Sequence, residues 1–243
     1  LIGAVMIGAA AVPGVQTGAP AMVLMRGLFG RRLSYLPTLI NIVQLLGWTV
    51  FEIVVISSAA KQLFPWHGHR WPYVVVAGVL TAAMTIRPLG AVRILRRYAL
   101  GAVVVATTYL FIELLRHSHA SFTHGSWSGF WAGADVAVAV AVSWAPLAAD
   151  YTRHARSSKS AFGGAVVGYS VTQIAGYFLG LVALATVVRA TDVNLQHDMF
   201  AAFIAVPVGW LAFGVLVLRE LDESFADGYS AVVSLQNVWP HWD

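Results

Sequence analysis

One face of segment 41–52 carries polar and aromatic side chains inside an otherwise apolar run. Asn41, Gln44, Trp48 and Glu52 follow at intervals of three, four and four residues, so they line one side of a helix. An indole with a carboxylate one turn further on suits a flat heterocycle, because the ring can stack and the acid can accept N–H donors. The alternative is a polar stripe that joins two membrane helices. We favour a cavity wall, because Trp48 lies far from the helix ends where interfacial tryptophans occur.

A second concentration of ionisable residues lies within the apolar segment 207–235. Arg219, Glu223 and Asp227 are spaced by four and share one helical face, with Glu220 and Asp222 beside them. A structural network could neutralise some of these charges, but one arginine cannot neutralise four acids. Charged groups inside a membrane are costly and commonly mark ion or proton pathways. The surplus carboxylates therefore favour a cation or proton route.

Pro146 interrupts another apolar segment. Proline has no N–H and cannot donate to the Val142 carbonyl, which frees a backbone acceptor. Transporters use interrupted helices to present bare backbone to a substrate or ion, and an ordinary proline kink is the alternative. Asp150 and Arg153, three residues apart near the end of this segment, are expected to form an ion pair that faces the cytoplasm.

The composition indicates which elements must position these residues. The 243 residues are 58% hydrophobic and 11% charged, with a mean hydropathy of +0.73, whereas soluble domains carry about 25% charged residues. The chain is therefore predicted to be an all-α polytopic membrane protein. About 20 apolar residues per helix gives seven spans: 1–25, 36–63, 73–86, 91–115, 129–149, 161–188 and 207–235. We expect one transmembrane domain over residues 1–243, incomplete at both ends because an apolar run is already in progress at Leu1.

The basic residues predict the orientation of these spans. If the first span ends in the cytoplasm, ten basic residues fall on the inner side and four on the outer side, with Arg219 inside the last span. The inner ones are Arg26, Arg31, Arg32, Arg87, Arg93, Arg96, Arg97, Arg153, Arg156 and Lys159, and the outer ones are Lys61, Arg70, Arg116 and Arg189. This bias obeys the positive-inside rule. The pI of 9.6 therefore reflects basic residues placed in the cytoplasmic loops. We expect a multi-pass protein of the cell membrane without a nucleic-acid partner.

Several other functions are disfavoured. The outer loops contain five histidines, but zinc ligands need fixed spacing and support, so no metal site is predicted; they are His67, His69, His117, His119 and His124. A retinal-binding receptor would need a lysine within its last helix, and Lys61 and Lys159 lie near span ends. The chain has no cysteine nucleophile, HExxH or GxSxG motif, so an enzyme is not expected.

Four stretches resemble the nucleobase–cation symporters, the family of cytosine, purine, allantoin and hydantoin permeases. They are TGAPAMVLMRGLFG (17–30), NIVQLLGW (41–48), VSWAPLAADYTRHAR (142–156) and FADGYSAVVSLQN (225–237). The likeness runs over nearly the whole chain and is greatest to the cytosine and hydroxymethylpyrimidine permease branch. It implies part of a leucine-transporter-type fold with a five-plus-five inverted repeat. The seven spans would then correspond to helices two to eight, without the broken first helix that lines the family's site.

The resemblance also implies which residues contact the substrate. In the family a tryptophan of helix three stacks on the base and a polar residue four positions later hydrogen-bonds it, which matches Trp48 and Glu52. Some relatives have an amide at the second place, so the acid is a departure. Helix six would contact the base within 140–144, and helix eight through Asp227, where the family has an asparagine. The predicted substrate-binding residues are Trp48, Glu52, Gln44, Ser143, Trp144 and Asp227.

The resemblance further implies a coupling ion. In some members helix-eight groups five or six residues before the asparagine bind sodium, which places Leu221, through its backbone, and Asp222 at a cation site. The expected function is a secondary active transporter that imports cytosine, hydroxymethylpyrimidine or a related base with Na⁺ or H⁺ and needs no cofactor. The alternative is a transporter of the same fold that carries a different small heterocycle or an amino-acid-like substrate.

Overall fold

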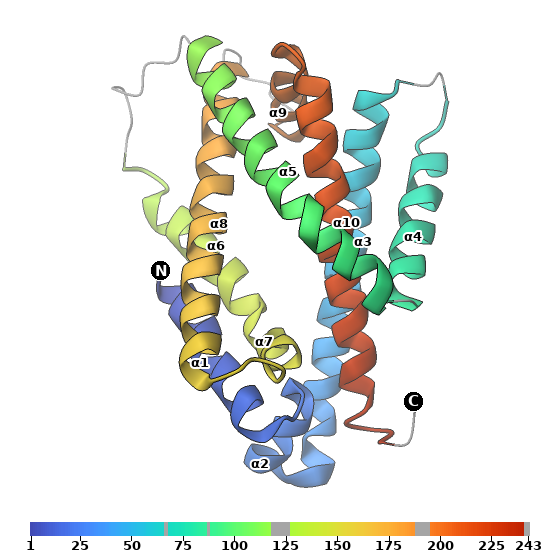
Figure 1. Ribbon diagram of the computed structural model, residues 1–243, viewed down its shortest axis with the longest axis vertical. Helices are drawn as coiled ribbons and strands as arrows, with labels where there is room; N and C mark the ends of the chain where they lie inside the picture. Colours follow the sequence, from blue (N-terminus) through green and yellow to red (C-terminus); the bar gives the residue numbers. More distant parts are fainter. Residues whose placement is uncertain (66–67, 87, 118–126, 188–194, 241–243) are drawn as a thin grey trace. The chain divides into compact units, whose positions relative to one another are not determined.

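The computed structural model describes residues 1–65, 68–86, 88–117, 127–187 and 195–240, and only the backbone of residues 88–98 and 195–196. Within these residues all regular structure is helical, which confirms the predicted class (Figure 1). The helices are α1 (Ile2–Thr17), α2 (Ala21–Leu33), α3 (Tyr35–Leu63), α4 (Trp71–Ile86), α5 (Pro88–His117), α6 (Phe130–Ser143), α7 (Ala145–Thr152), α8 (Ser158–Val187), α9 (Leu195–Ala205) and α10 (Gly209–Leu235).

Each of the seven predicted apolar segments contains a helix. Among the described residues, four helices are long and apolar enough to cross a bilayer, and the bent pair α1–α2 brings the number to five: Tyr35–Leu63, Ala99–His117, Phe130–Thr152, Ser158–Thr186 and the pair. Of the other two predicted spans, α4 is apolar but has 16 residues. Helix α10 is long enough, with 27 residues, but its five charged residues all lie between Arg219 and Asp227.

The first predicted span, 1–25, is wrong in its extent, because it comprises two helices. α1 ends at Thr17, where Gly18 takes the left-handed conformation with φ 69° and its N–H donates to the Gly14 carbonyl at 2.8 Å. Glycine adopts this conformation without steric cost. Pro20 then precedes α2, which is bent by 85° from α1. The TGAP sequence contains this glycine-then-proline stop signal, but a count of apolar residues overlooks it.

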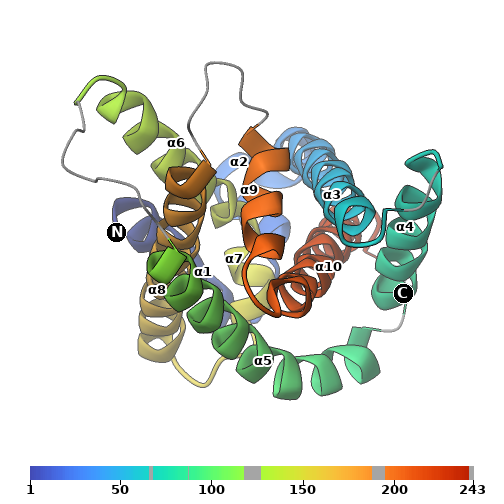
Figure 2. The same ribbon diagram turned by 90° about the horizontal axis from the view of Figure 1, so that it is seen from above.

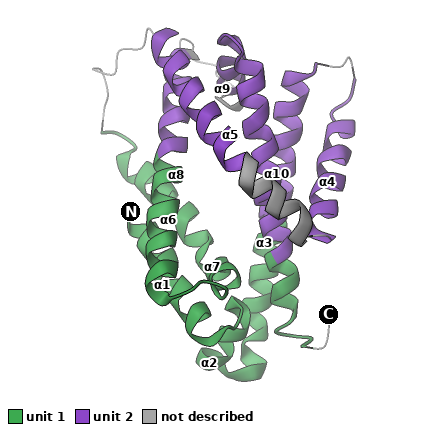
Figure 3. Ribbon diagram, in the orientation of Figure 1, with its two compact units in different colours: residues 1–46, 123–174, 230–243 green, residues 47–122, 175–229 purple. Residues whose placement is uncertain are grey.

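The helices form two compact units, which Figure 3 shows in different colours. Unit 1 comprises residues 1–46, 123–174 and 230–243, and unit 2 comprises residues 47–122 and 175–229. Three of the four boundaries fall inside α3, α8 and α10, so each of these helices contributes to both units. The units are therefore not consecutive segments of the chain.

In unit 1, α1 packs closely against α6 and α7 through small residues. A Cβ added to Gly3 would lie 2.3 Å from the Ala141 Cβ, and one added to Gly14 would lie 2.8 Å from the Ala149 Cα. Ala11, between them on α1, is fully buried. Small residues let membrane helices approach each other this closely, because backbone atoms then make the contact.

A buried asparagine after α10 bonds to α2 and to the beginning of α3 in unit 1. Asn237, just after α10, is fully buried and donates from Nδ2 to the Thr38 hydroxyl at 2.8 Å and the Ser34 hydroxyl at 3.1 Å. Arg26 of α2 donates from Nε to Asn237 Oδ1 at 2.5 Å and from Nη2 to its carbonyl at 2.7 Å. Further along the same helices, Asn41 Nδ2 donates to the Ser234 hydroxyl at 3.1 Å. These bonds fix the beginning of α3 to the end of α10.

The core of unit 2 is apolar and aromatic. Phe213 of α10 contacts Phe200 and Phe203 of α9, with ring centroids 5.0 Å and 5.4 Å apart. Leu110 and Leu114 of α5 are buried in the same cluster, and α9 lies against α5 (Figure 2). Helix α9 lies between the predicted spans 161–188 and 207–235, and its 11 residues are too few to count as a span.

Candidate substrate site

The sequence-predicted stripe of α3 is present and faces inward. Asn41 and Glu52 are buried and Trp48 is half-buried, whereas Val50 and Val54 on the other side of the helix are exposed. Exposed valine belongs on a surface covered by lipid, and polar residues of membrane helices face the protein interior. The position of Glu52 on the helix is therefore set by the amphipathic pattern of α3.

Within unit 2, Glu52 is a buried acid with an unpartnered oxygen. Its residue surface is 5% exposed, and its Oε2 atom has no hydrogen-bonding partner among the described residues. Such an atom is costly to bury unless something else supplies a donor. One turn earlier on the same helix, the Trp48 indole contacts Phe51 edge-on, with ring centroids 5.8 Å apart.

Asp227 of α10 has the same character. It is 3% exposed, and its Oδ2 atom lacks a hydrogen-bonding partner among the residues that the structure describes. The helix around it is held closely against α4: Thr81 donates to the buried Ser224 hydroxyl at 3.2 Å, and a Cβ added to Gly228 would lie 2.9 Å from the Thr85 hydroxyl. These contacts fix the rotation of α10 that buries Asp227.

The acids and the arginine of α10 act electrostatically on Glu52. Asp227, Glu223 and Glu220 repel its negative charge, and Arg219 attracts it. Arg219 forms an ion pair with Glu223 and lies 3.5 Å from Glu220, measured from Nη1 to Oε1. Arg219 therefore offsets the acids of its own helix first, and these acids disfavour a negative charge on Glu52.

The remaining predicted substrate residues, Gln44, Ser143 and Trp144, lie in unit 1. α6 ends at Ser143 and α7 begins at Ala145, so a one-residue break lies just before Pro146. Trp144 keeps a right-handed helical conformation, with φ −83° and ψ −14°, and the break resembles a kink more than an extended segment.

A side chain of α3 occupies this break. Leu147 N–H donates to the Trp144 carbonyl at 3.1 Å, which is a tighter turn than the α-helical bond to Ser143. Gln44 Nε2 donates to the Ser143 carbonyl at 2.9 Å. The sequence predicted a free carbonyl at Val142. The carbonyl that accepts a side-chain hydrogen bond is that of Ser143, one residue further along the chain. Gln44 and Ser143 are therefore in direct contact within unit 1, and their assignment to a substrate site stays a prediction.

The predicted cation site lies on a continuous helix. Leu221 is buried in the apolar core of unit 2, and Asp222 is half-buried beside it. α10 runs without a break from Gly209 to Leu235, so the Leu221 carbonyl belongs to a regular helix, whose carbonyls already accept a backbone N–H. The assignment of Leu221 and Asp222 to a cation stays a prediction.

Asp150 has a different role from the predicted cytoplasm-facing ion pair. It is only 1% exposed, and its Oδ1 atom accepts the N–H of Ala21, the first residue of α2, at 2.8 Å. The structure records no Asp150–Arg153 ion pair among the described residues, although Arg153 still acts on the aspartate electrostatically. A carboxylate at a helix N-terminus satisfies a free N–H and opposes the helix dipole. Sequence spacing could not reveal this partner, because 129 residues separate the two.

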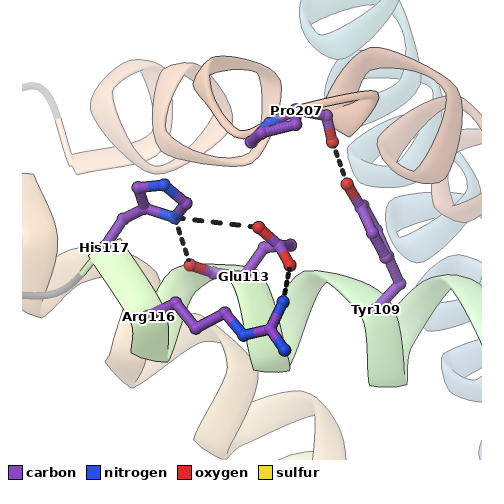
Figure 4. A network of polar contacts seen from close by, with 5 residues as sticks. All are labelled: Tyr109, Glu113, Arg116, His117 and Pro207. Carbon is purple, nitrogen blue, oxygen red and sulfur yellow. Dashed lines mark hydrogen bonds and ion pairs between the residues drawn. The ribbon is translucent and has the colours of Figure 1, made fainter.

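Several polar contacts lie near the C-terminal end of α5 in unit 2 (Figure 4). Arg116 Nη1 lies 2.8 Å from Glu113 Oε1, His117 Nδ1 donates to the Glu113 carbonyl at 2.8 Å, and the Tyr109 hydroxyl donates to the Pro207 carbonyl. Of the loop histidines, His69 is exposed, whereas His67, His119 and His124 lie outside the described residues. Glu113 thus has a basic neighbour on its own helix, unlike Glu52.

Comparison with known proteins identifies the family. A family model described as a permease for cytosine/purines, uracil, thiamine and allantoin matches residues 1–241. The vitamin B6 transporter of Saccharomyces cerevisiae is 23% identical over 261 residues, which cover 97% of this chain and 44% of the transporter. The chain thus spans less than half the length of this curated relative, and no solved structure matches it. The predicted resemblance is confirmed: the chain belongs to the permease family for cytosine/purines, uracil, thiamine and allantoin, and is a multi-pass protein of the cell membrane.

Proposed function

We propose that the protein is a secondary active transporter that imports a nucleobase or a related pyrimidine, such as cytosine or hydroxymethylpyrimidine, together with Na⁺ or H⁺. The observation that carries the proposal is the buried Glu52 carboxylate, whose Oε2 atom has no partner among the described residues, one turn beyond Trp48. A flat base stacked on the indole would supply the missing N–H donor. The activity of the family is transport, and we propose no catalytic step for this chain.

Asp227 supports the same function from α10. Like Glu52 it is buried in unit 2 with an oxygen that has no partner among the described residues. A carboxylate accepts two or more N–H donors, so Glu52 and Asp227 can each bind a different edge of one heterocycle. The acids between Arg219 and Asp227 favour a cation or proton as the coupling ion, with Leu221 and Asp222 as its proposed ligands.

Gln44, Ser143 and Trp144 are the proposed substrate residues of unit 1. Gln44 already donates to the Ser143 carbonyl at 2.9 Å, so both groups are held in place before a substrate binds. A preorganised polar pair costs less conformational entropy on binding than two mobile side chains. Trp144 lies directly at the break between α6 and α7.

A different heterocycle is the second candidate. The yeast relative is named a vitamin B6 transporter, and family members named in the comparison carry several ring systems. Asp227 stands where the resemblance implies an asparagine, and Glu52 where some relatives have an amide. Acids at both places favour a substrate richer in donors or positive charge than a neutral base.

Uptake by the intact protein in cells tests the function. A panel of radiolabelled cytosine, hydroxymethylpyrimidine, uracil and pyridoxine should reveal at least one substrate, and its uptake should depend on either sodium or a proton gradient. Uptake of none of the panel, with the protein present in the membrane, would contradict the proposal.

Replacing the stacking residue gives the first specific prediction. Trp48→Ala should weaken binding of the transported heterocycle by about tenfold or more, because both stacking and buried apolar area are lost. Binding to purified protein should be measured by competition. Trp131→Ala is the matched control, because Trp131 is 82% exposed. If Trp48→Ala binds as tightly as the parent, Trp48 does not contact the substrate.

A further inference from the structure

We propose that Glu52 and Asp227 act together as an anionic pair that selects heterocycles carrying a positive charge over neutral ones. This inference rests on the proposed function, because it specifies the substrate of the same site. It concerns two acids of one unit, on α3 and α10.

The first reason is that both acids are buried with unused acceptors. Glu52 Oε2 and Asp227 Oδ2 are each inaccessible to solvent and have no hydrogen-bonding partner among the described residues. By comparison, Glu113, the buried acid of α5 in the same unit, has Arg116 Nη1 at 2.8 Å. Glu52 and Asp227 therefore lack the kind of partner that a buried acid elsewhere in unit 2 has, and a ligand can supply it.

The second reason is the balance of charge around Glu52. Burial above all, and then the charges of Asp227, Glu223 and Glu220, disfavour a negative charge on Glu52, whereas the charge of Arg219 favours it. Arg219 is paired with Glu223, is close to Glu220, and is also acted on by Asp222. A buried surplus of negative charge is unfavourable. A ligand cation between Glu52 and Asp227 would offset their repulsion, whereas a neutral ligand could only donate hydrogen bonds.

The third reason is the indole one turn from Glu52. Trp48 is half-buried one turn before Glu52 on α3. The face of a tryptophan attracts a cation more strongly than other aromatic faces do. An aromatic face one turn from a buried carboxylate is thus suited to a flat ring with a positive charge. The indole and the carboxylate would each favour a cation over a neutral ring.

A matched pair of probes tests charge directly. Nicotinamide is neutral, and 1-methylnicotinamide has the same ring with a permanent positive charge; uracil and thiamine provide a second neutral and cationic comparison. Dissociation constants should be measured for the intact purified protein in nanodiscs at pH 7. We expect each cation to bind at least about tenfold more tightly than its neutral counterpart, the ratio that one charge-assisted contact produces.

Isosteric variants assign the selectivity to the two acids. Glu52→Gln and Asp227→Asn keep the side-chain shape and remove one charge each. Each should weaken binding of the cations by about tenfold and change binding of the neutral probes by less than about threefold. Glu113→Gln removes a buried charge of unit 2 outside the proposed site, so it should leave the cation-to-neutral ratio unchanged.

The outcomes separate the two proposals. Parent protein that binds a neutral heterocycle at least as tightly as its cationic counterpart would overturn the inference and leave the proposed function standing. Binding of no heterocycle at all would overturn both. Variants that lose pH dependence of uptake while keeping the cation-to-neutral ratio would show that the acids carry a proton, which also overturns the inference. The measurement on the parent protein decides the question even if a variant fails to fold.

Discussion

At the scale of single residues, the buried acids differ in the hydrogen-bond and ion-pair partners of their carboxylates. Glu113 has an arginine on its own helix, and Asp150 accepts a backbone N–H of α2. Glu52 and Asp227 each retain an oxygen without a partner among the described residues. Burial of a polar group is favourable only when its hydrogen bonds are replaced. Asp150 also has an oxygen, Oδ2, without a partner among the described residues, but its Oδ1 holds the start of α2. Glu52 and Asp227 are the two such acids of unit 2, and for these we propose a ligand.

The role of Asp150 leads to a prediction about stability. Asp150→Ala should leave the Ala21 N–H buried without an acceptor and lower the free energy of unfolding by about 1–3 kcal/mol. Asp150→Asn retains an amide oxygen that can take the place of Oδ1, so it should lower the free energy of unfolding by less than Asp150→Ala. Thermal unfolding of the purified variants in one detergent measures the difference. Equal stability of the alanine and asparagine variants would show that the 2.8 Å bond to Ala21 does not hold α2.

At the scale of elements, the packing of α1 depends on the absence of side chains. Gly14 lies where an added Cβ would come within 2.9 Å of the Ala149 Cβ and carbonyl oxygen. Neither the Cβ nor the carbonyl of a buried helix can move away as a flexible side chain would. The contact between α1 and α7 is therefore set by backbone geometry, as in other membrane helix pairs with small residues at the interface.

Gly14→Ala should consequently separate α1 from α7 and destabilise the protein by about 1–3 kcal/mol, the usual cost of overpacking. Gly168→Ala is the matched control: an added Cβ at Gly168, on α8, meets no other atom within 4 Å. The two variants should be compared by thermal unfolding in the same detergent. A Gly14→Ala protein as stable as the Gly168→Ala protein would contradict the close packing.

At the scale of the whole molecule, orientation in the membrane follows from the bias of basic residues. Ten lie on the expected inner side and four on the outer side, although the side chains of Arg87, Arg93, Arg96, Arg97 and Arg189 are outside those that the structure describes. Positively charged loops remain in the cytoplasm during insertion. The end of α3 should thus be extracellular and the start of α8 cytoplasmic.

The chain contains no cysteine, so introduced cysteines can report this orientation. A membrane-impermeant thiol reagent should label Phe64→Cys in intact cells, and Ser157→Cys only after the cytoplasmic face is made accessible. Both positions are exposed, and neither substitution changes the number of basic residues. The reverse labelling pattern would contradict the assigned topology.

The amino-acid sequence by itself determined the class, the family and most helices of this protein. Apolar length and sparse charge require membrane-spanning helices, and the spacing of Asn41, Trp48 and Glu52 placed them on one face before any contact was known. The break before Pro146 was also predictable, because proline cannot complete the helical hydrogen bond. These properties depend on local chemistry, and the sequence contains all of it.

Only the tertiary structure decided which polar groups have partners. The bond from Asp150 to Ala21 and that from Gln44 to the Ser143 carbonyl join residues far apart in the chain, and no periodicity encodes such pairs. Helix α9 and the bend after Thr17 were missed because a count of apolar residues measures length and ignores short helices and left-handed glycines. The unpartnered oxygens of Glu52 and Asp227 became visible only once their neighbours were placed, because hydrogen-bond satisfaction depends on distances between helices.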